Sequence, residues 1–176
     1  QAKQLELGLG TFSPKLGVFA QCLESEPYSL QEKSISKNRF KNSSTKTLLY
    51  AGRIIPNKGI SQLIRCLNIW PKKNVRIRIV GSYESDFNHS QSNSSCANFK
   101  QWFQRETDFS KSVEIEHSPA LPIHYLIEEF HKSDVLVCPS FHEDEACGMT
   151  AHAAVLCGMP AIVTDWSGLG QLGRNN

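Results

Sequence analysis

Two basic residues, Arg53 and Lys58, are the clearest candidates for ligand chemistry in this sequence. They lie on either side of a turn that follows an apolar segment. An arginine and a lysine placed in this way can converge on one diphosphate, the arginine as a planar fork and the lysine as a point charge. A helix expected to begin at Gly148 adds N–H donors, because the first turn of a helix attracts anions. The pattern predicts a phosphate-binding site, and the competing interpretation is a pair of exposed turn charges.

An acidic loop, Glu143-Asp144-Glu145, precedes Gly148. It follows an apolar run at 135–138, which has the character of a buried parallel strand and is stopped by proline and serine. In open parallel sheets, ligands bind beyond the carboxyl ends of the strands, where this loop is expected to lie. The loop is therefore a second candidate for ligand contact, with a solvated acidic surface as the alternative.

The elements that must position these residues alternate along the chain. Apolar segments of strand length are separated by segments whose apolar residues recur at helical spacing. The expected strands are residues 47–52, 75–80, 113–116, 135–138 and 161–164. The expected helices are residues 59–70, 96–108, 123–131 and 148–157. This alternation predicts right-handed crossovers and an α/β fold with a Rossmann-like, mostly parallel sheet and helices on both faces.

Three details of packing follow from the same patterns. Segment 75–80 alternates apolar residues with two arginines, which indicates an edge or near-edge strand. Helix 59–70 places Ile60, Leu63, Ile64, Leu67 and Trp70 on one face, and helix 148–157 does the same with Met149, Ala153, Leu156 and Cys157. Cys66, Cys138 and Cys157 lie inside apolar elements and are expected to be small buried hydrophobes.

Each expected strand ends in a group that could contact a ligand. These groups are Gly52 with Arg53, Gly81 with Ser82, His117 with Ser118, the acidic loop with Gly148, and Asp165. The chain contains neither G-x-G-x-x-G nor G-x-x-x-x-G-K-[ST], which weighs against a dehydrogenase and a P-loop enzyme. Histidines and cysteines lack metal-ligand spacing, so no metal is expected.

Composition excludes several other classes. The net charge of +2 is too small to indicate nucleic-acid binding. No apolar run approaches the ~20 residues that a membrane span needs. The cysteine pattern fits a reducing cytoplasm. Residues 1–46 are expected to form an N-terminal segment and linker, and residues 47–176 a domain that is incomplete at its C-terminal end.

The motifs, taken in order, resemble the retaining GT-B glycosyltransferases of the "group 1" type. G-R-x4-K-G precedes a helix, a second strand ends in V-G, and S-D-V-x-V-x-P-S is followed by E-x-x-G, C-G-x-P-x-I and D-x-x-G-L. The match covers residues 47–172, which is most of the donor-binding, carboxyl-terminal domain of that family. Each motif is weak by itself, but their order and spacing are specific.

The resemblance implies a nucleotide-diphosphate-sugar donor. Arg53 and Lys58 would hold the diphosphate and stabilise its developing charge as it leaves, and Glu145 would bind hydroxyls of the sugar. The remaining donor-binding candidates are Gly52, Gly59, Gly81, His117, Ser118, Glu143, Gly148, Met149 and Thr150. The loop near His117 would lie beside the base. No cofactor or metal is implied.

Two departures from the family pattern stand out. The family places a second glutamate, which binds ribose, eight residues after the first, and that position is Ala153 here. The loop after Pro139 is also longer than usual, so Glu143 competes with Glu145 for the sugar. Glu145 is favoured because it keeps the three-residue spacing to Gly148.

Two functions are consistent with these observations. The first is the donor half of a retaining glycosyltransferase that passes a hexosyl group to a glycan or lipid-linked glycan. Its partner would be an N-terminal acceptor-binding domain, and whether that domain places a cytoplasmic enzyme at a membrane surface stays open. The alternative is a catalytically inactive nucleotide-binding or scaffold domain of the same fold. In either case the 176 residues alone are not expected to transfer sugar.

Overall fold

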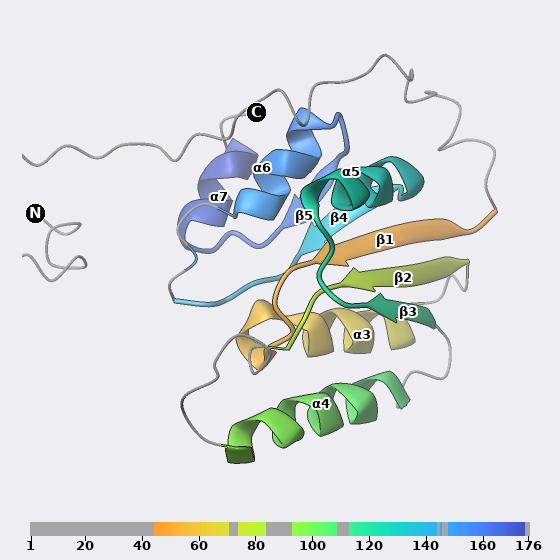
Figure 1. Cartoon of the computed structure of the whole chain (residues 1–176). Helices are drawn as coiled ribbons and strands as arrows, with labels where there is room; N and C mark the ends of the chain where they lie inside the picture. Colours follow the sequence, from red (N-terminus) through yellow and green to blue (C-terminus); the bar gives the residue numbers. More distant parts are fainter. Residues whose placement is uncertain are drawn as a thin grey trace, which may run out of the picture.

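The computed structural model describes residues 44–70, 74–83, 93–108, 113–143, 145 and 148–174, without the side chains of residues 93–99, 171, 173 and 174. Residues 1–43 of the expected N-terminal segment, most of the polar loop after residue 82 and Asp144 lie outside these residues. The described part forms one α/β unit, in which a single sheet lies between two layers of helices (Figure 1).

The sheet has five parallel strands in the order β3-β2-β1-β4-β5. These strands are β1 (Lys46–Ala51), β2 (Val75–Val80), β3 (Glu114–Ser118), β4 (Val135–Cys138) and β5 (Ala161–Val163). The chain builds outward from β1 to β3, then crosses back to place β4 on the other side of β1. The predicted Rossmann-like fold is confirmed, and each predicted strand is present to within two residues at either end.

Helices cover both faces of the sheet (Figure 1). The first layer holds α3 (Ile60–Asn68), preceded by the short 3-10 helix η2 (Pro56–Lys58), and α4 (Asn93–Asp108). The second holds α5 (Ile123–Lys132), α6 (Met149–Leu156) and α7 (Ser167–Arg174). Since every helix follows a parallel strand, α3 and α6 begin at the carboxyl edge of the sheet.

The apolar core confirms the predicted face of α3 except at its end. Ile60, Leu63, Ile64 and Leu67 are buried against β2. The helix ends at Asn68, so Trp70 lies beyond it and is 52% exposed, contrary to the prediction. Cys66 is also exposed, because it occupies the outer face of α3. The prediction of burial is correct for Cys157, while Cys138 is half-buried.

Helix α6 packs through small residues. Ala151, Ala153 and Ala154 are buried, whereas Met149 and Leu156 are exposed, so the predicted face was wrong at two of its four positions. Alanine side chains allow a helix to approach a sheet closely, and here they occupy the inward side. The larger residues of α6 consequently point away from the core.

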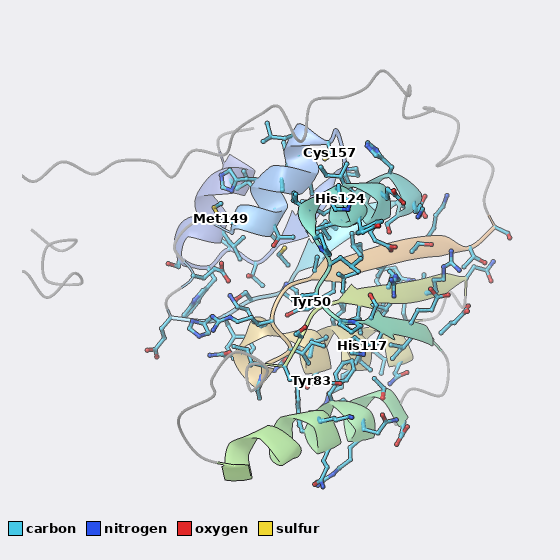
Figure 2. The ribbon with its side chains drawn as sticks, viewed as in Figure 1. Tyr50, Tyr83, His117, His124, Met149 and Cys157 are labelled. Atoms are coloured by element: carbon cyan, nitrogen blue, oxygen red, sulfur yellow. The ribbon has the colours of Figure 1, made fainter. Side chains whose placement is uncertain are left out.

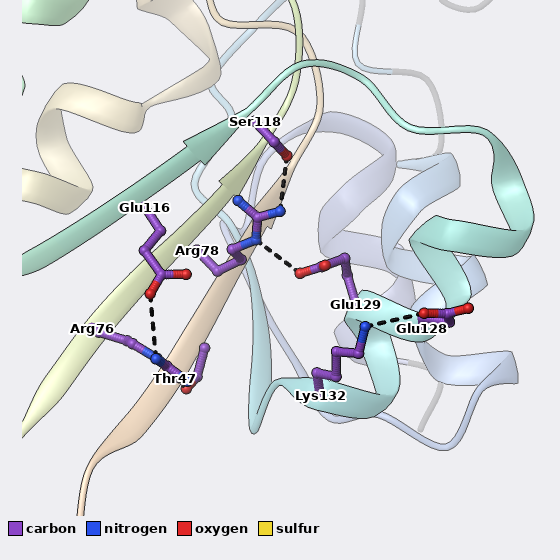
Figure 3. A network of polar contacts seen from close by, with 8 residues as sticks. All are labelled: Thr47, Arg76, Arg78, Glu116, Ser118, Glu128, Glu129 and Lys132. Atoms are coloured by element: carbon purple, nitrogen blue, oxygen red, sulfur yellow. Dashed lines mark hydrogen bonds and ion pairs between the residues drawn. The ribbon is translucent and has the colours of Figure 1, made fainter.

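Strand β2 is next to the edge, as its alternation predicted. Its two arginines lie on the side of the sheet that faces α5 and form a polar network (Figure 3). Arg78 donates to Glu129 of α5 and to the hydroxyl of Ser118, both at 2.9 Å, while Arg76 donates to the hydroxyl of Thr47 at 3.0 Å. This network ties the edge of the sheet to α5.

Candidate functional site

The turn after β1 carries both candidate basic residues. Tyr50 is buried near the end of the strand, and its hydroxyl donates a 2.5 Å hydrogen bond to the carbonyl oxygen of Arg53. Burial, followed by the nearby Cys138 and Glu145, raises the pKa of Tyr50, so the phenol stays protonated and remains a donor. Arg53 itself is exposed at the carboxyl edge of the sheet.

Gly59 brings this turn against the loop that follows β4. Its φ of 77° lies in the left-handed region, and a Cβ at this position would collide with the carbonyl oxygen of Pro139. The amide of Phe141 donates to the carbonyl oxygen of Asn57 at 3.0 Å and closes the same contact. The glycine that ends G-R-x4-K-G therefore allows Lys58 to reach the acidic loop.

The loop after β4 is also held from the side of β5. The hydroxyl of Thr164 donates to the carbonyl oxygen of Ser140 at 2.5 Å, and the indole N–H of Trp166 donates to that of His142 at 2.9 Å. The amide of Gly168, at the start of α7, donates to the carbonyl oxygen of Glu145 at 3.2 Å. Hydrogen bonds to the carbonyl oxygens of Ser140, His142 and Glu145 thus hold these residues at the carboxyl edge.

Lys58 and Glu145 form a direct ion pair in this position. Only 17% of the lysine side chain and 14% of the glutamate side chain are exposed, so the pair is partly shielded from water. Burial alone would raise the pKa of Glu145, but hydrogen bonds from Lys58 and Ser140, with the charges of Lys58 and His142, lower it overall. The carboxylate is therefore held ionised beside a fixed cation.

The second acidic candidate, Glu143, is exposed on the same loop. The side chain of Glu145 is mostly buried and contacts Lys58 in the turn after β1, while Asp144 between the two glutamates is outside the described residues. Of the two glutamates, the structure brings Glu145 to Lys58.

Gly148 caps the amino end of α6 and follows Glu145 by three residues in the sequence. Its φ is 64°, and a Cβ would collide with the side chain of Leu169 of α7. The carbonyl oxygen of Gly148 accepts the amides of Ala151 at 2.8 Å and His152 at 3.1 Å, which is the first turn of the helix. Met149 and Thr150 follow within that turn, exposed and half-buried respectively.

The remaining donor-binding candidates lie at the carboxyl ends of β1, β2 and β3 and connect these strands through hydrogen bonds. The amide of Gly52 donates to Val80 and that of Gly81 to Ser118, both at 3.0 Å. His117 Nε2 lies 3.0 Å from the carbonyl oxygen of Gly81, and because a carbonyl only accepts, this nitrogen carries the proton. The hydroxyl of Ser118 accepts the bond from Arg78 described above.

An aromatic cluster forms around His117 (Figure 2). Its ring meets Phe103 of α4 edge-on at 5.3 Å between centroids, and Tyr83 in the same way at 5.8 Å. Tyr83 follows β2 and forms an isolated bridge with Ile54. The cluster packs α4 against this end of the carboxyl edge.

Ala153 is 4% exposed and belongs to the core under α6. The residue at which the resemblance to the family would place a second glutamate is thus a packing residue here. No side-chain acceptor for a ribose hydroxyl is available from this position.

Sequence reasoning missed three supporting residues: Ser140, Thr164 and Tyr50. Ser140 was interpreted only as a strand terminator, although it follows a buried strand at the edge where ligand groups were sought. Tyr50 could have been noticed because a buried phenol needs a hydrogen-bond partner. The side-chain oxygens of Asn57, in the turn after β1, and Ser61, in the first turn of α3, are buried with no hydrogen-bond partner among the described residues.

Comparison with known proteins establishes the family. Residues 31–176 match the family described as "Glycosyl transferases group 1", and the chain belongs to this family of glycosyltransferases. No curated protein sequence matches the chain significantly. Within the described residues, no group of three or more metal-binding side chains is present, and no helix could cross a membrane.

Solved structures with the same fold are GT-B glycosyltransferases. One is Anabaena Alr3699/HepE in complex with UDP-glucose, with a TM-score of 0.69 and 19% identity over 94% of this chain. A second is a sucrose-phosphate synthase from Thermosynechococcus elongatus, with a TM-score of 0.58 and 20% identity over 84% of this chain. A third is the C-terminal domain of LpcC from Francisella tularensis, with a TM-score of 0.57 and 14% identity over 86% of this chain. The alignments span 43%, 34% and 74% of those chains respectively. This chain therefore corresponds to one half of a GT-B fold.

Proposed function

We propose that this chain is the donor-binding part of a glycosyltransferase and binds a nucleotide-diphosphate sugar at the carboxyl edge of β1 and β4. The observation that carries the proposal is the juxtaposition of Lys58 and Glu145 beside the amino end of α6, in a chain of the glycosyl transferases group 1 family. A diphosphate matches the lysine and the helix end, and sugar hydroxyls match the carboxylate.

The remaining groups are assigned from their positions around this pair. Arg53 contributes a second cation for the diphosphate, and the backbone of Gly148 and Met149 contributes N–H donors. The base lies against His117 and its aromatic neighbours. Glu143 is left outside the site because it is exposed and two residues further from Gly148. No metal or cofactor is proposed.

The chemistry follows from the charge that develops on the leaving group. As the glycosyl–phosphate bond breaks, the diphosphate gains negative charge and the sugar becomes oxocarbenium-like. Fixed cations and helix N–H groups stabilise this state more than the ground state, which lowers the barrier. In the whole protein the sugar would pass to a glycan or lipid-linked acceptor with retention, and the leaving phosphate would accept the proton of the acceptor.

Calorimetric titration of the purified protein with a panel of UDP-, GDP- and ADP-sugars tests this proposal. We expect micromolar binding of at least one donor, and a loss of ~1–3 kcal/mol in Arg53→Ala and Lys58→Ala, the range for hydrogen bonds to charged groups. Lys132→Ala is the matched control, because this exposed lysine pairs with Glu128 on α5. Unchanged affinity in both site variants would remove the phosphate site from the proposal.

A second function is favoured by one observation, the alanine at position 153. If that residue marks the loss of donor affinity, the chain is a binding or scaffold domain of the same fold. Absence of binding across the whole donor panel would support this alternative and overturn the first.

A further inference from the structure

The Lys58–Glu145 ion pair affects which ligand the proposed donor site prefers. This inference rests on the proposed function. The proposal assigns the lysine to the diphosphate of the donor and the glutamate to its sugar. In the structure these two groups already satisfy each other. A ligand that takes one of them must therefore also provide for the other.

The glutamate is the less movable partner of the pair. Its carbonyl oxygen accepts from Gly168, and its amide donates to the carbonyl oxygen of His142 at 3.1 Å. Ser140 helps to lower the pKa of this carboxyl, and it is itself buried, with its carbonyl oxygen accepting from the hydroxyl of Thr164. A carboxylate fixed in this way cannot easily turn toward solvent when Lys58 is taken by a phosphate.

Partial burial makes the loss of a partner costly. An exposed ion pair contributes little, because water replaces each partner readily. Here both side chains are more than four-fifths buried, so the remaining carboxylate is poorly solvated and lies beside an anionic ligand. A bare nucleoside diphosphate engages Lys58 but offers Glu145 no donor.

A sugar nucleotide changes this balance. Its sugar hydroxyl groups donate to the carboxylate of Glu145 in place of the N–H groups of Lys58. Its phosphate oxygens then accept hydrogen bonds from Lys58. We propose that Glu145, by competing for Lys58, makes the site discriminate in favour of the intact sugar nucleotide and against the bare nucleoside diphosphate. The same competition favours release of the nucleoside diphosphate after the sugar has left.

This inference differs from the expectation that the sequence supports. From the sequence, Glu145→Gln should weaken only the sugar-bearing donor and leave the bare nucleotide unaffected, because the carboxylate makes no favourable contact with phosphate. The ion pair predicts instead that the variant binds the bare nucleotide more tightly.

Calorimetry measures the affinities of UDP and UDP-glucose in parallel. If the donor panel identifies another sugar nucleotide, that compound and its nucleoside diphosphate are used instead. In Glu145→Gln, UDP should bind roughly 3- to 10-fold more tightly, as expected when a partly buried charge no longer competes for the lysine. UDP-glucose should bind more weakly, and its preference over UDP should fall by roughly tenfold or more. Glu143→Gln makes the same change of charge on the exposed part of the loop and should alter neither affinity.

A double-mutant cycle shows whether the effect passes through Lys58. The gain in UDP affinity caused by Glu145→Gln should largely disappear when Lys58 is already replaced by glutamine. Far-UV circular dichroism of each variant establishes that the fold is retained.

The outcomes separate this inference from the proposed function. Tighter UDP and weaker UDP-glucose in Glu145→Gln, lost in the Lys58→Gln background, support both. Weaker UDP-glucose with unchanged or weaker UDP overturns the competition but leaves the donor site standing. A gain in UDP affinity that persists without Lys58 also overturns it, since direct repulsion would then be the cause. Failure of the original protein to bind any donor overturns the proposed function and the inference together.

Discussion

Lys58 and Glu145 form an ion pair across 87 residues of sequence, joining the turn after β1 to the loop after β4. These two strands are neighbours in the sheet, although β2 and β3 intervene along the chain. The connection after β1 leads to β2 on one side, and the connection after β4 leads to β5 on the other side. The carboxyl ends of β1 and β4 therefore border the crevice at which α/β sheets bind ligands. The pair therefore lies at the topological switch point of the fold.

Removing the charge of Glu145 should destabilise the protein in a pH-dependent way. The pKa of this carboxyl is lower in the folded protein than its ordinary value of 4.5. The ion pair consequently contributes stability that is fully present above the unfolded pKa and is lost as the pH falls through the folded pKa. We expect Glu145→Gln to melt below the original protein near pH 7, and the difference to shrink as the pH falls below 4.5.

Thermal melts of Glu143→Gln over the same pH range provide the control. This residue is exposed, and its replacement should change the melting temperature little at any pH. A difference between Glu145→Gln and the original protein that stays constant or grows in acid would contradict the assigned ionisation of Glu145.

Gly59→Ala should destabilise the turn that carries Lys58. The backbone there has a φ of 77°, and a methyl group would collide with the carbonyl oxygen of Pro139. Strain and steric overlap together should cost more than about 1 kcal/mol. Urea denaturation measures this loss, and calorimetry should show weaker UDP binding because Lys58 is displaced.

Gly158→Ala separates these two effects. Its φ of 70° imposes similar backbone strain at the end of α6, away from the turn after β1. We expect lower stability with unchanged UDP affinity. Equal losses of affinity in both variants would indicate a general effect of instability instead of a local one at Lys58.

Tyr50→Phe should weaken diphosphate binding without touching the ligand. The buried hydroxyl holds the carbonyl of Arg53, so its removal takes away this hydrogen bond and loosens the turn that carries the arginine. The stability loss should be about 1 kcal/mol, with a few-fold loss in UDP affinity. Tyr125→Phe on α5 is the matched control, because that side chain is 51% exposed. An unchanged UDP affinity in Tyr50→Phe would remove this residue from the support of Arg53.

The fold could be predicted because strands and helices alternate with different apolar periods. The errors occurred where burial depends on how an element is rotated or where it ends. Trp70 continues the apolar spacing of α3 but follows its last residue, and Cys66 lies on the outer side of the same helix. In α6 almost every residue is apolar, so the spacing could not show that the alanines face inward.

The candidate site could be predicted only as a set of residues at one edge. Sequence spacing placed Lys58 and Glu145 after two predicted strands, but did not show that these strands are neighbours. Their direct contact also depends on the close approach that Gly59 permits to Pro139. The support from Ser140 and Thr164 depends on the register of β4 and β5, which no local pattern records. Burial of Ala153 likewise follows from the packing of α6.

The last prediction concerns Asp134, in the S-D-V segment at the opposite edge of the sheet. Its carboxylate accepts the amide of Thr47 at 2.7 Å and thereby joins the beginning of β4 to the beginning of β1. The side chain is buried, and its other oxygen has no hydrogen-bond partner among the described residues. Asp134→Ala would leave the Thr47 amide unpaired in the interior, at a cost of ~1–3 kcal/mol.

Asp134→Asn should lose less stability, because the amide oxygen can still accept the bond from Thr47. Urea denaturation of both variants measures the two losses, and calorimetry with UDP measures the site. Since Asp134 lies at the amino edge and the proposed donor site at the carboxyl edge, UDP affinity should remain that of the original protein in both. A loss of UDP affinity in the well-folded asparagine variant would show that this aspartate supports the ligand site as well as the sheet.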